Sequence, residues 1–366
     1  MSQAPTPAAN PATNGDPAGH ALAAAFGLAP ADDLWGPQSV AATVTARWYA
    51  EGFVAPLPDL GLLSVGGDEA ASFLHSQLTN DVEHLPEGQA RWYGYCTAKG
   101  RMLGSFLGWR EPGAIRLAAT RTMLESLRKR LTMFVLRAKV RIDDASGGVA
   151  LLGLGGEAAS VALEELGVAA PASMHTTSAP GIVAIGLPPA LVDGAEWERW
   201  LLAVSRADLE RVAAALGKRL ARVGSAQWRW TEVRAGVARI VPATSELFVP
   251  QMVNYELVDG VSFTKGCYPG QEVVARSHYL GKLKRRMFAG HVQGEPPAPA
   301  ADVFGATGDE PCGQVVMAAP APQGGADLLF ECRIDAAQAG GLRVGEAPLT
   351  LAALPYAVPA NPPPPG

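Results

Sequence analysis

The sequence contains few cysteines and no long apolar run. Only four of its 366 residues are cysteine. They lie far apart, at Cys96, Cys267, Cys312 and Cys332. A secreted disulfide scaffold is not expected at this size and cysteine density, and no pair has the spacing of a zinc or redox motif. No stretch of about 18 consecutive apolar residues exists, so no membrane-spanning helix is expected.

A strong charge of either sign is also missing. The formal net charge is −5, with 18% charged and 48% hydrophobic residues. Such a balance gives no overall case for nucleic-acid or membrane binding, while the apolar fraction allows a sizeable core. The N-terminus has no cationic segment followed by an apolar one, so no signal peptide is expected. These features indicate a cytoplasmic protein.

Strand and helix signals alternate between two tails rich in alanine and proline. The patterns predict strands at residues 62–65, 93–96, 102–109, 115–119, 135–142, 149–154, 182–185 and 200–204. They predict helices at residues 69–78, 122–132, 157–166 and 207–216, with Asp68 as the N-cap of the first. This rhythm is typical of α+β domains with antiparallel sheets. Residues 294–301 predict a linker, and the short strands from residue 287 onward predict a small β-barrel.

The octapeptide KGCYPGQE at residues 265–272 is the most informative motif. A thiol reacts as the thiolate, which a nearby cation stabilises. In an extended backbone, Lys265 and Cys267 would point to the same face. The flanking glycines allow tight turns and close approach of a ligand. These features favour a positioned, reactive Cys267. The alternative is a small buried cysteine in a structural turn, with Lys265 only capping a helix.

Several blocks together resemble the YgfZ-type folate-binding proteins. They are KGCYPGQE with its flanks LVDGVSFT and VVAR, FLHSQLTNDV at residues 73–82, YCTAKGRM at 95–102 and LPY at 354–356. That family is related to the aminomethyltransferase of the glycine cleavage system and assists the assembly and repair of iron–sulfur clusters. The resemblance covers roughly residues 55–358.

The resemblance implies a fold as well. It implies a three-domain ring of interleaved α+β domains with a C-terminal β-barrel. Residues 35–90 and 225–286 would form a discontinuous first domain, residues 91–224 a ferredoxin-like α+β domain and residues 287–358 the barrel. Residues 1–34 and 359–366 are expected to be disordered tails.

The implied function is a tetrahydrofolate-binding accessory protein for iron–sulfur clusters in enzymes, including tRNA-modifying ones. Cys267 would act as the thiolate and Lys265 would tune it. The expected cofactor is tetrahydrofolate or a one-carbon derivative, without a permanently bound metal. One cysteine cannot supply the usual four thiolates, so Cys267 would contact a cluster only transiently. The expected partners are iron–sulfur carrier or client proteins, with neither a membrane nor a nucleic acid.

The implied folate contacts fall in three parts of the chain, at residue 60, at 228–234 and at 268–276. Trp228 offers an indole face on which a pteridine could stack, worth about 1 kcal/mol beyond burial. A second family tryptophan falls where this chain has Leu60. Arg234 or Arg276 could pair with the glutamate carboxylates of folate. The alternatives are a core aromatic for Trp228 and salt bridges for the two arginines. The resemblance adds three more contacts from the motif, Tyr268, Gln271 and Glu272.

Other activities stay open. Aminomethyltransferases carry a catalytic aspartate in a segment that corresponds to residues 117–125 here, and this segment has none. Ordinary aminomethyl transfer is therefore not expected, although another folate-dependent one-carbon transfer is an alternative. A second alternative is an RNA-binding regulator. It would bind RNA through a basic cluster of six residues: Arg276, His278, Lys282, Lys284, Arg285 and Arg286. The structural alternative for this cluster is a solvated strand edge that carries protective charges.

Overall fold

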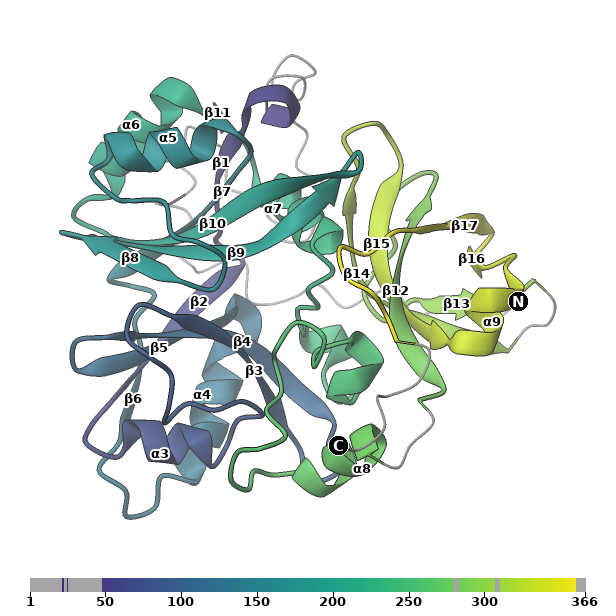
Figure 1. Ribbon diagram of the computed structural model, residues 1–366, viewed down its shortest axis with the longest axis horizontal. Helices are drawn as coiled ribbons and strands as arrows, with labels where there is room; N and C mark the ends of the chain where they lie inside the picture. The colour runs from purple at the N-terminus through teal and green to yellow at the C-terminus, as the bar shows by residue number, and fades with distance from the viewer. Residues whose placement is uncertain (1–21, 23–24, 26–47, 280–282, 307–309, 360–366) are drawn as a thin grey trace, which may run out of the picture.

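The computed structural model describes Leu22, Ala25 and residues 48–279, 283–306 and 310–359 (Figure 1). Two open sheets and a closed barrel make up its β-structure, with helices between and beside them. The predicted α+β class with a C-terminal barrel is thereby confirmed. The predicted tails lie almost entirely outside these residues. No helix in the described ranges is both long and apolar enough to cross a membrane.

The five-stranded sheet lies in the lower half of Figure 1. In spatial order it contains β3 (Ala90–Cys96), β4 (Met102–Glu111), β5 (Ala114–Thr120), β2 (Leu60–Gly66) and β6 (Arg141–Asp144). Its helical segments are α3 (Ala70–His75), η1 (Arg121–Met123) and α4 (Leu124–Met133). Because an α-helix turns every 3.6 residues, Leu124, Leu127 and Leu131 share the buried face of α4.

Two local predictions in this region were wrong. The strand predicted at 135–142 pairs only from Arg141, because the backbone N–H groups of Phe134, Val135 and Ala138 close turns instead. Asp68 does not cap α3; Glu69 occupies the N-cap position and makes no side-chain capping bond. The alternating apolar residues after α4 therefore belong to a turn, not to a sheet.

The six-stranded sheet has a ferredoxin-like core. Its spatial order is β11 (Ala221–Arg222), β1 (Phe53–Pro56), β7 (Val149–Gly155), β10 (Ala195–Ser205), β9 (Ile182–Val192) and β8 (Thr176–Ala179). Apart from the edge strand β8, which lies between α5 and β9 along the chain, the order β7, α5 (Ala158–Glu165), β9, β10, α6 (Leu209–Arg219) and β11 is the βαββαβ order of that fold. The N-terminal strand β1 is inserted between β11 and β7.

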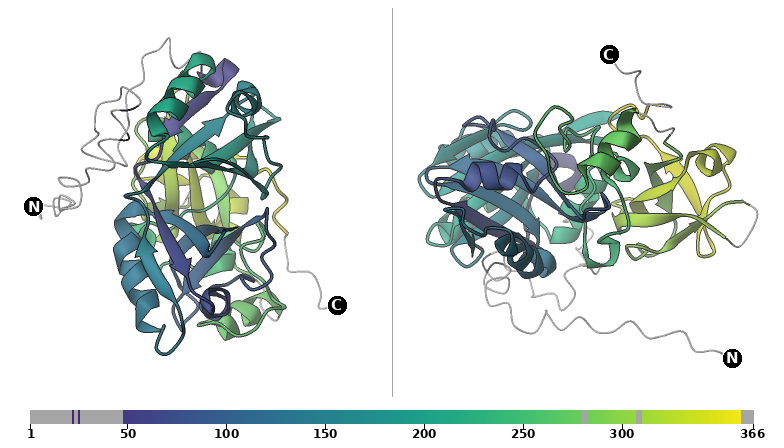
Figure 2. Two further views of the ribbon diagram at one scale, coloured as in Figure 1. Left: turned by 90° about the vertical axis from the view of Figure 1, so that its left-hand side faces the viewer. Right: turned by 90° about the horizontal axis from the view of Figure 1, so that it is seen from below.

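The barrel lies beside the two open sheets (Figure 2). It closes in the order β12 (Arg285–Val292), β15 (Ala326–Arg333), β14 (Pro311–Pro320), β13 (Asp302–Phe304), β16 (Arg343–Val344) and β17 (Ala347–Ala352), with α9 (Ile334–Ala339) after β15. The linker predicted at 294–301 does not separate this barrel from the rest. Strand β12 already belongs to the barrel, since it pairs with both β15 and β17. Residues 294–301 therefore join β12 to β13 within the barrel.

Helix α7 (Ser225–Arg234) lies where the parts of the molecule meet. It contacts strands of the six-stranded sheet and the barrel strands β14 and β15. The segment after it contains η2 (Pro242–Thr244), η3 (Pro250–Val253) and α8 (Gln271–Tyr279). One apolar cluster includes residues from both open sheets, α7 and the barrel. The molecule therefore has a shared core at this junction.

The sheets group the strands differently from the predicted domain ranges. The predicted boundary at 90/91 falls at the start of β3, which shares a sheet with β2, and the boundary at 286/287 falls within β12. The physical reason is that residues 60–144 and 149–222 have a similar alternation of strands and helices. Such an alternation shows which segments are strands, but not which strands pair.

Candidate functional site

The cysteine loop, residues 260–270, is anchored by a buried lysine. Lys265 is 9% exposed, and its Nζ donates hydrogen bonds to the carbonyl oxygens of His75 and Leu78, the latter at 2.7 Å. The same Nζ lies 4.8 Å from the ring centroid of Tyr268. Burial lowers the pKa of Lys265 to about 8, although the charges of Asp81 and Cys267 act to raise it. Lys265 thus connects the loop to the end of α3.

Cys267 differs sharply from the other cysteines. It is exposed, whereas Cys96, Cys312 and Cys332 are all buried. Burial raises the pKa of Cys96 to about 12, so that thiol stays protonated and unreactive. Of the four thiols, Cys267 is therefore the one that a reagent or a partner can reach directly.

The second half of the cysteine loop packs against the turn between β3 and β4. Gly270 has φ +83°, and a Cβ at this position would lie 2.4 Å from the carbonyl oxygen of Thr97. From the start of α8, the Gln271 side-chain amide donates a long hydrogen bond of 3.5 Å to the Lys265 carbonyl oxygen. Tyr268 is buried. Glycine is thus required where the backbone turns and approaches Thr97.

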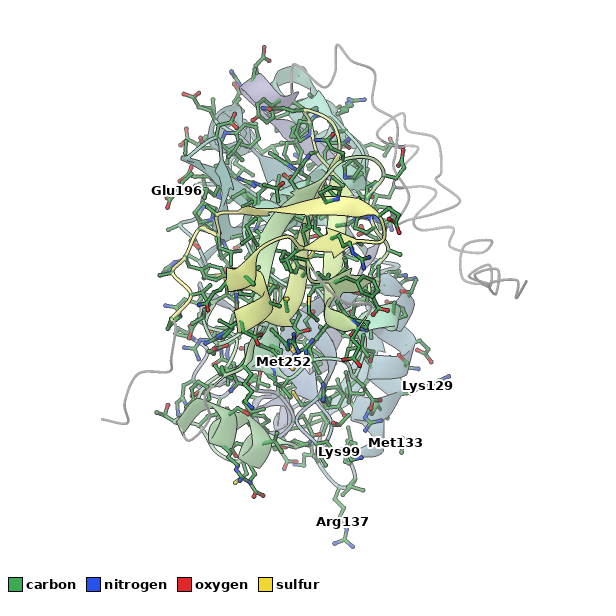
Figure 3. All side chains as sticks on the ribbon, turned by 90° about the vertical axis from the view of Figure 1, so that its right-hand side faces the viewer. Lys99, Lys129, Met133, Arg137, Glu196 and Met252 are labelled. Atoms are coloured by element: carbon green, nitrogen blue, oxygen red, sulfur yellow. The ribbon has the colours of Figure 1, made fainter. Side chains whose placement is uncertain are left out.

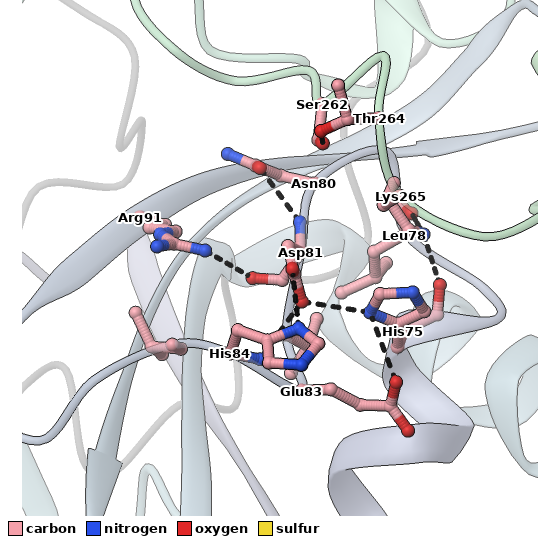
Figure 4. Close-up of polar contacts among 12 residues, drawn as sticks. His75, Leu78, Asn80, Asp81, Glu83, His84, Arg91, Ser262, Thr264 and Lys265 are labelled. Atoms are coloured by element: carbon pink, nitrogen blue, oxygen red, sulfur yellow. Dashed lines mark hydrogen bonds and ion pairs between the residues drawn. The ribbon is translucent and has the colours of Figure 1, made fainter.

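A carboxylate–histidine cluster lies beside this loop (Figure 4). Asp81 Oδ1 lies 3.0 Å from His75 Nδ1, and Asp81 Oδ2 lies 2.8 Å from His84 Nδ1. A Cβ on Gly266 would lie 3.4 Å from His75 Nε2, so the imidazole faces the loop next to Cys267. Burial acts to raise the pKa of Asp81, but hydrogen bonds from His84 and the charges of both histidines lower it to about 2. The motif FLHSQLTNDV contained His75 and Asp81 but not His84, and its letters alone did not indicate a position near Cys267.

A central cavity brings together two of the predicted folate contacts. Trp228 and Leu60 both line it, and its volume is about 40 Å³. Trp228 is only 1% exposed; a Cβ on Gly153 would lie 2.2 Å from its ring, and the Arg199 guanidinium lies 5.2 Å from its ring centroid. The sequence did not single out Trp92, which lines the same cavity from β3. Trp92 thus supplies a second indole beside Leu60, the position at which the resemblance implied a family tryptophan.

A buried ion-pair cluster borders this cavity. Arg239 Nη2 lies 2.8 Å from Asp59 Oδ2 and 3.0 Å from Glu232 Oε2. Glu232 and Arg239 both line the cavity. Burial raises the pKa of Glu232, and the charge of Arg239 opposes this change. In the described residues, Asp59 Oδ1 and the Trp228 indole nitrogen are buried without a hydrogen-bond partner. The cavity therefore combines aromatic walls with polar groups, but it is far too small for a pteridine in this conformation.

The remaining predicted contacts lie elsewhere. Arg234 faces a separate cavity of about 140 Å³, where its Nη1 lies 3.8 Å from Asp327 and its Nε donates to the Leu191 carbonyl. Arg276 and Glu272 are exposed on α8. The structure thus places the predicted folate residues at three separate positions.

The proposed basic cluster is partly engaged in ion pairs. Arg285 pairs with Glu331, and the buried Arg286 pairs with Glu256. Lys284 is exposed, whereas Lys282 and the His278 side chain lie outside the described residues. Arg285 thus pairs within the barrel, whereas Arg286 joins the barrel strand β12 to the segment that follows η3. Among the described residues, no group of three or more His, Cys, Asp or Glu side chains could hold a metal ion.

About two-thirds of the chain is similar to curated proteins of known name. The chain is 32% identical over 256 residues to the tRNA-modifying protein YgfZ of Colwellia psychrerythraea, covering 69% of this chain and 76% of that relative. It is 30% identical to the YgfZ protein of Yersinia pestis (strain Pestoides F), covering 66% and 72%. The chain belongs to the YgfZ family. No protein-family model matches it.

The fold of this YgfZ-family chain is also that of a solved aminomethyltransferase. The glycine cleavage system aminomethyltransferase T from Bartonella henselae superimposes with a TM-score of 0.70 at 18% identity, covering 86% of this chain and 88% of that one. At this identity the likeness establishes the fold alone. The resemblance inferred from the sequence motifs is confirmed for both the family and the fold.

Proposed function

We propose that this YgfZ-family protein is a tetrahydrofolate-binding accessory protein that assists the assembly or repair of iron–sulfur clusters in client enzymes. The observation that carries the proposal is the exposed Cys267 on a loop held by the buried Lys265. Because the relatives are named tRNA-modifying proteins, we infer that the clients include enzymes that modify tRNA.

The chemistry of the loop supports a reactive thiol. The Lys265 ammonium is buried, and burial lowers its pKa to about 8 while the charges of Asp81 and Cys267 act in the opposite direction, so a thiolate at Cys267 would be attracted to this ammonium. A thiolate is the form that attacks electrophiles and binds iron. Lys265 therefore has two roles in this proposal: it positions the loop and it favours the thiolate of Cys267.

The cluster is cargo in this proposal. One exposed cysteine provides one thiolate, whereas iron–sulfur clusters usually take four protein ligands. The remaining ligands must come from a carrier or client protein. Cys267 would then contact a cluster, or the protein that delivers it, during transfer.

Folate would bind at the central cavity by this proposal. The indoles of Trp228 and Trp92 suit a flat ring, and the Glu232 carboxyl suits its amino and amide groups. The cavity volume of about 40 Å³ requires Leu60 and its neighbours to move apart first. Tetrahydrofolate supplies a one-carbon unit or a reductant when bound; this chain's residues would bind and orient its ring.

The thiol part is tested with a Cys267→Ala allele. Cys267 is exposed, so the substitution should leave folding and folate affinity unchanged while iron–sulfur enzyme activities fall under oxidative stress. Full retention of those activities would remove the thiol role. The matched control is Cys267→Ser, which keeps the size of the side chain and should also fail.

The folate part is tested separately by titrating tetrahydrofolate, without oxygen, against the purified protein. Trp228→Phe and Trp92→Phe should weaken binding, whereas Trp197→Phe should not, because Trp197 belongs to another aromatic cluster. Equal affinity in all three variants would mean that folate binds elsewhere or not at all.

A folate-dependent one-carbon transferase is the second candidate, because the fold is that of an aminomethyltransferase. Incubation of the pure protein with methylene-tetrahydrofolate and candidate acceptors tests it. Absence of turnover would leave the accessory role.

A further inference from the structure

The turn after α4 exposes a group of apolar side chains. Met133, Phe134 and Leu136 are 73%, 46% and 88% exposed. They are three of the six large apolar side chains that are exposed in the described ranges. Figure 3 shows Met133 and Arg137 at the lower end of the molecule, where Arg137 projects beyond the ribbon. Adjacent exposed apolar residues at one extremity indicate an interaction surface.

The fold does not use these side chains. The buried face of α4 consists of Leu124, Leu127 and Leu131, which precede the turn. Leu136 has φ +46°, a left-handed conformation that is unfavourable for leucine, yet its side chain gains almost no burial. Packing within this chain therefore gives no account of why the turn presents apolar residues.

The same segment is strongly basic. Residues 126–142 contain no acidic residue, and six cations surround the apolar group: Arg128, Lys129, Arg130, Arg137, Lys139 and Arg141. Three of them have acidic partners, since Glu125 pairs with Arg128 and Lys129, and Asp143 pairs with Arg141. In the described part of the chain, no carboxylate forms a salt bridge with the other three. The balanced charge of the whole sequence hides this local excess.

We propose that residues 128–141, the basic–apolar tip, dock the protein onto an anionic lipid surface. A bilayer interface accepts a few apolar side chains at the level of the acyl chains while cations bind the headgroups above them. The tip has both components: along the chain, the exposed Met133, Phe134 and Leu136 lie between two groups of cations. The docking goes beyond the proposed role in cluster maintenance and does not depend on it.

Two other occupants fit the tip less well. RNA would be bound by the cations and could stack on Phe134, but Met133 and Leu136 offer nothing to phosphates or bases. A protein partner would need a concave apolar pocket with an acidic rim that matches a projecting turn. A lipid surface needs no such match in shape.

The test is cosedimentation of the full-length protein with vesicles at low salt. One set contains about 30% phosphatidylglycerol in phosphatidylcholine, and the other contains phosphatidylcholine alone. The variants are Met133→Ser/Phe134→Ser/Leu136→Ser and Arg137→Glu/Lys139→Glu, all at exposed positions. Matched controls are Leu351→Ser and Lys218→Glu, an exposed apolar residue and an exposed cation in other elements.

The wild type should bind the anionic vesicles, not the neutral ones, and added salt should weaken the binding. Each cation near an anionic surface strengthens binding roughly fivefold, so loss of two cations should weaken it at least about 25-fold. The apolar variant should lose at least about tenfold, and both controls should bind like the wild type. Absence of vesicle binding, or equal binding by all variants, would overturn the proposal. The proposal would also be overturned if the tip variants bound vesicles like the wild type and were defective only in their affinity for tRNA.

Discussion

The buried cluster around Arg239 gives a quantitative prediction. The Arg239 side chain is 8% exposed and pairs with Asp59, which is completely buried, and with Glu232, which is 14% exposed. Arg239→Met keeps an unbranched side chain of similar length but leaves two carboxylates without their cation. Breaking a buried ion pair in this way costs about 3–5 kcal/mol. We expect the free energy of unfolding to fall by that amount.

The effect should also depend on pH, and its sign follows from Glu232. Burial already raises the pKa of Glu232, and Arg239 opposes that rise. Without Arg239, the folded state holds a proton on Glu232 up to a higher pH than the unfolded state does. The variant therefore loses stability as pH rises through that window. Each unit of additional pKa rise makes the loss about 1.4 kcal/mol larger at a pH above that window than at a pH below it.

Urea unfolding followed by circular dichroism at both pH values measures these effects. Arg276→Met is the matched control, because Arg276 is exposed on α8 and its loss should change stability by less than about 0.5 kcal/mol. If Arg239→Met stayed within about 1 kcal/mol of the wild type, or lost the same amount at both pH values, the ion-pair reasoning would be refuted.

Four further predictions concern the cysteine loop and the carboxylate–histidine cluster beside it. A thiol reagent should modify one of the four cysteines, Cys267, in the native protein and all four after denaturation; a second native thiol would contradict the burial pattern. Lys265→Met should slow alkylation of Cys267 severalfold near neutral pH, and an unchanged rate would exclude thiolate stabilisation. Gly270→Ala should cost about 1–3 kcal/mol in a thermal or urea unfolding assay, whereas Gly266→Ala should cost little, because its new Cβ meets only ordinary contacts. The pKa of Asp81 is lowered to about 2, so its negative charge stabilises the fold above the ordinary aspartate pKa, and this stabilisation is lost as pH falls toward 2. The wild type should therefore lose more stability on acidification than Asp81→Asn does. Equal losses in the two proteins would count against this.

The sequence predicted more of the fold than of the site. The hairpin of β3 and β4, strand β7 and the helices α4 to α6 follow from apolar periodicity that is local in the chain. The grouping of strands into sheets does not, because β1 pairs with residues that follow it at a great distance along the chain. Non-local pairing leaves no periodic signal in either strand.

In the site, too, local features could be predicted from the sequence and contacts between distant residues could not. The motif around Cys267 indicated a reactive cysteine, and its exposure agrees with that interpretation. An extended backbone would have placed Lys265 on the same face, but the structure buries Lys265 because two carbonyl groups near the end of α3 accept its hydrogen bonds. Trp92 reaches the central cavity only through the sheet arrangement. Partners that are distant in sequence decide these details.

The insertion of β1 has a consequence for synthesis of the chain. Phe53 pairs on one side with Gly155 of β7 and on the other with Ala221 of β11. As the ribosome releases the chain, β1 leaves first, but one of its edges stays unpaired until residue 221 has emerged. Exposed strand edges invite pairing with other chains. Newly made chains therefore face a long interval of aggregation risk, and shortening translation pauses between residues 155 and 221 should raise the yield of folded protein.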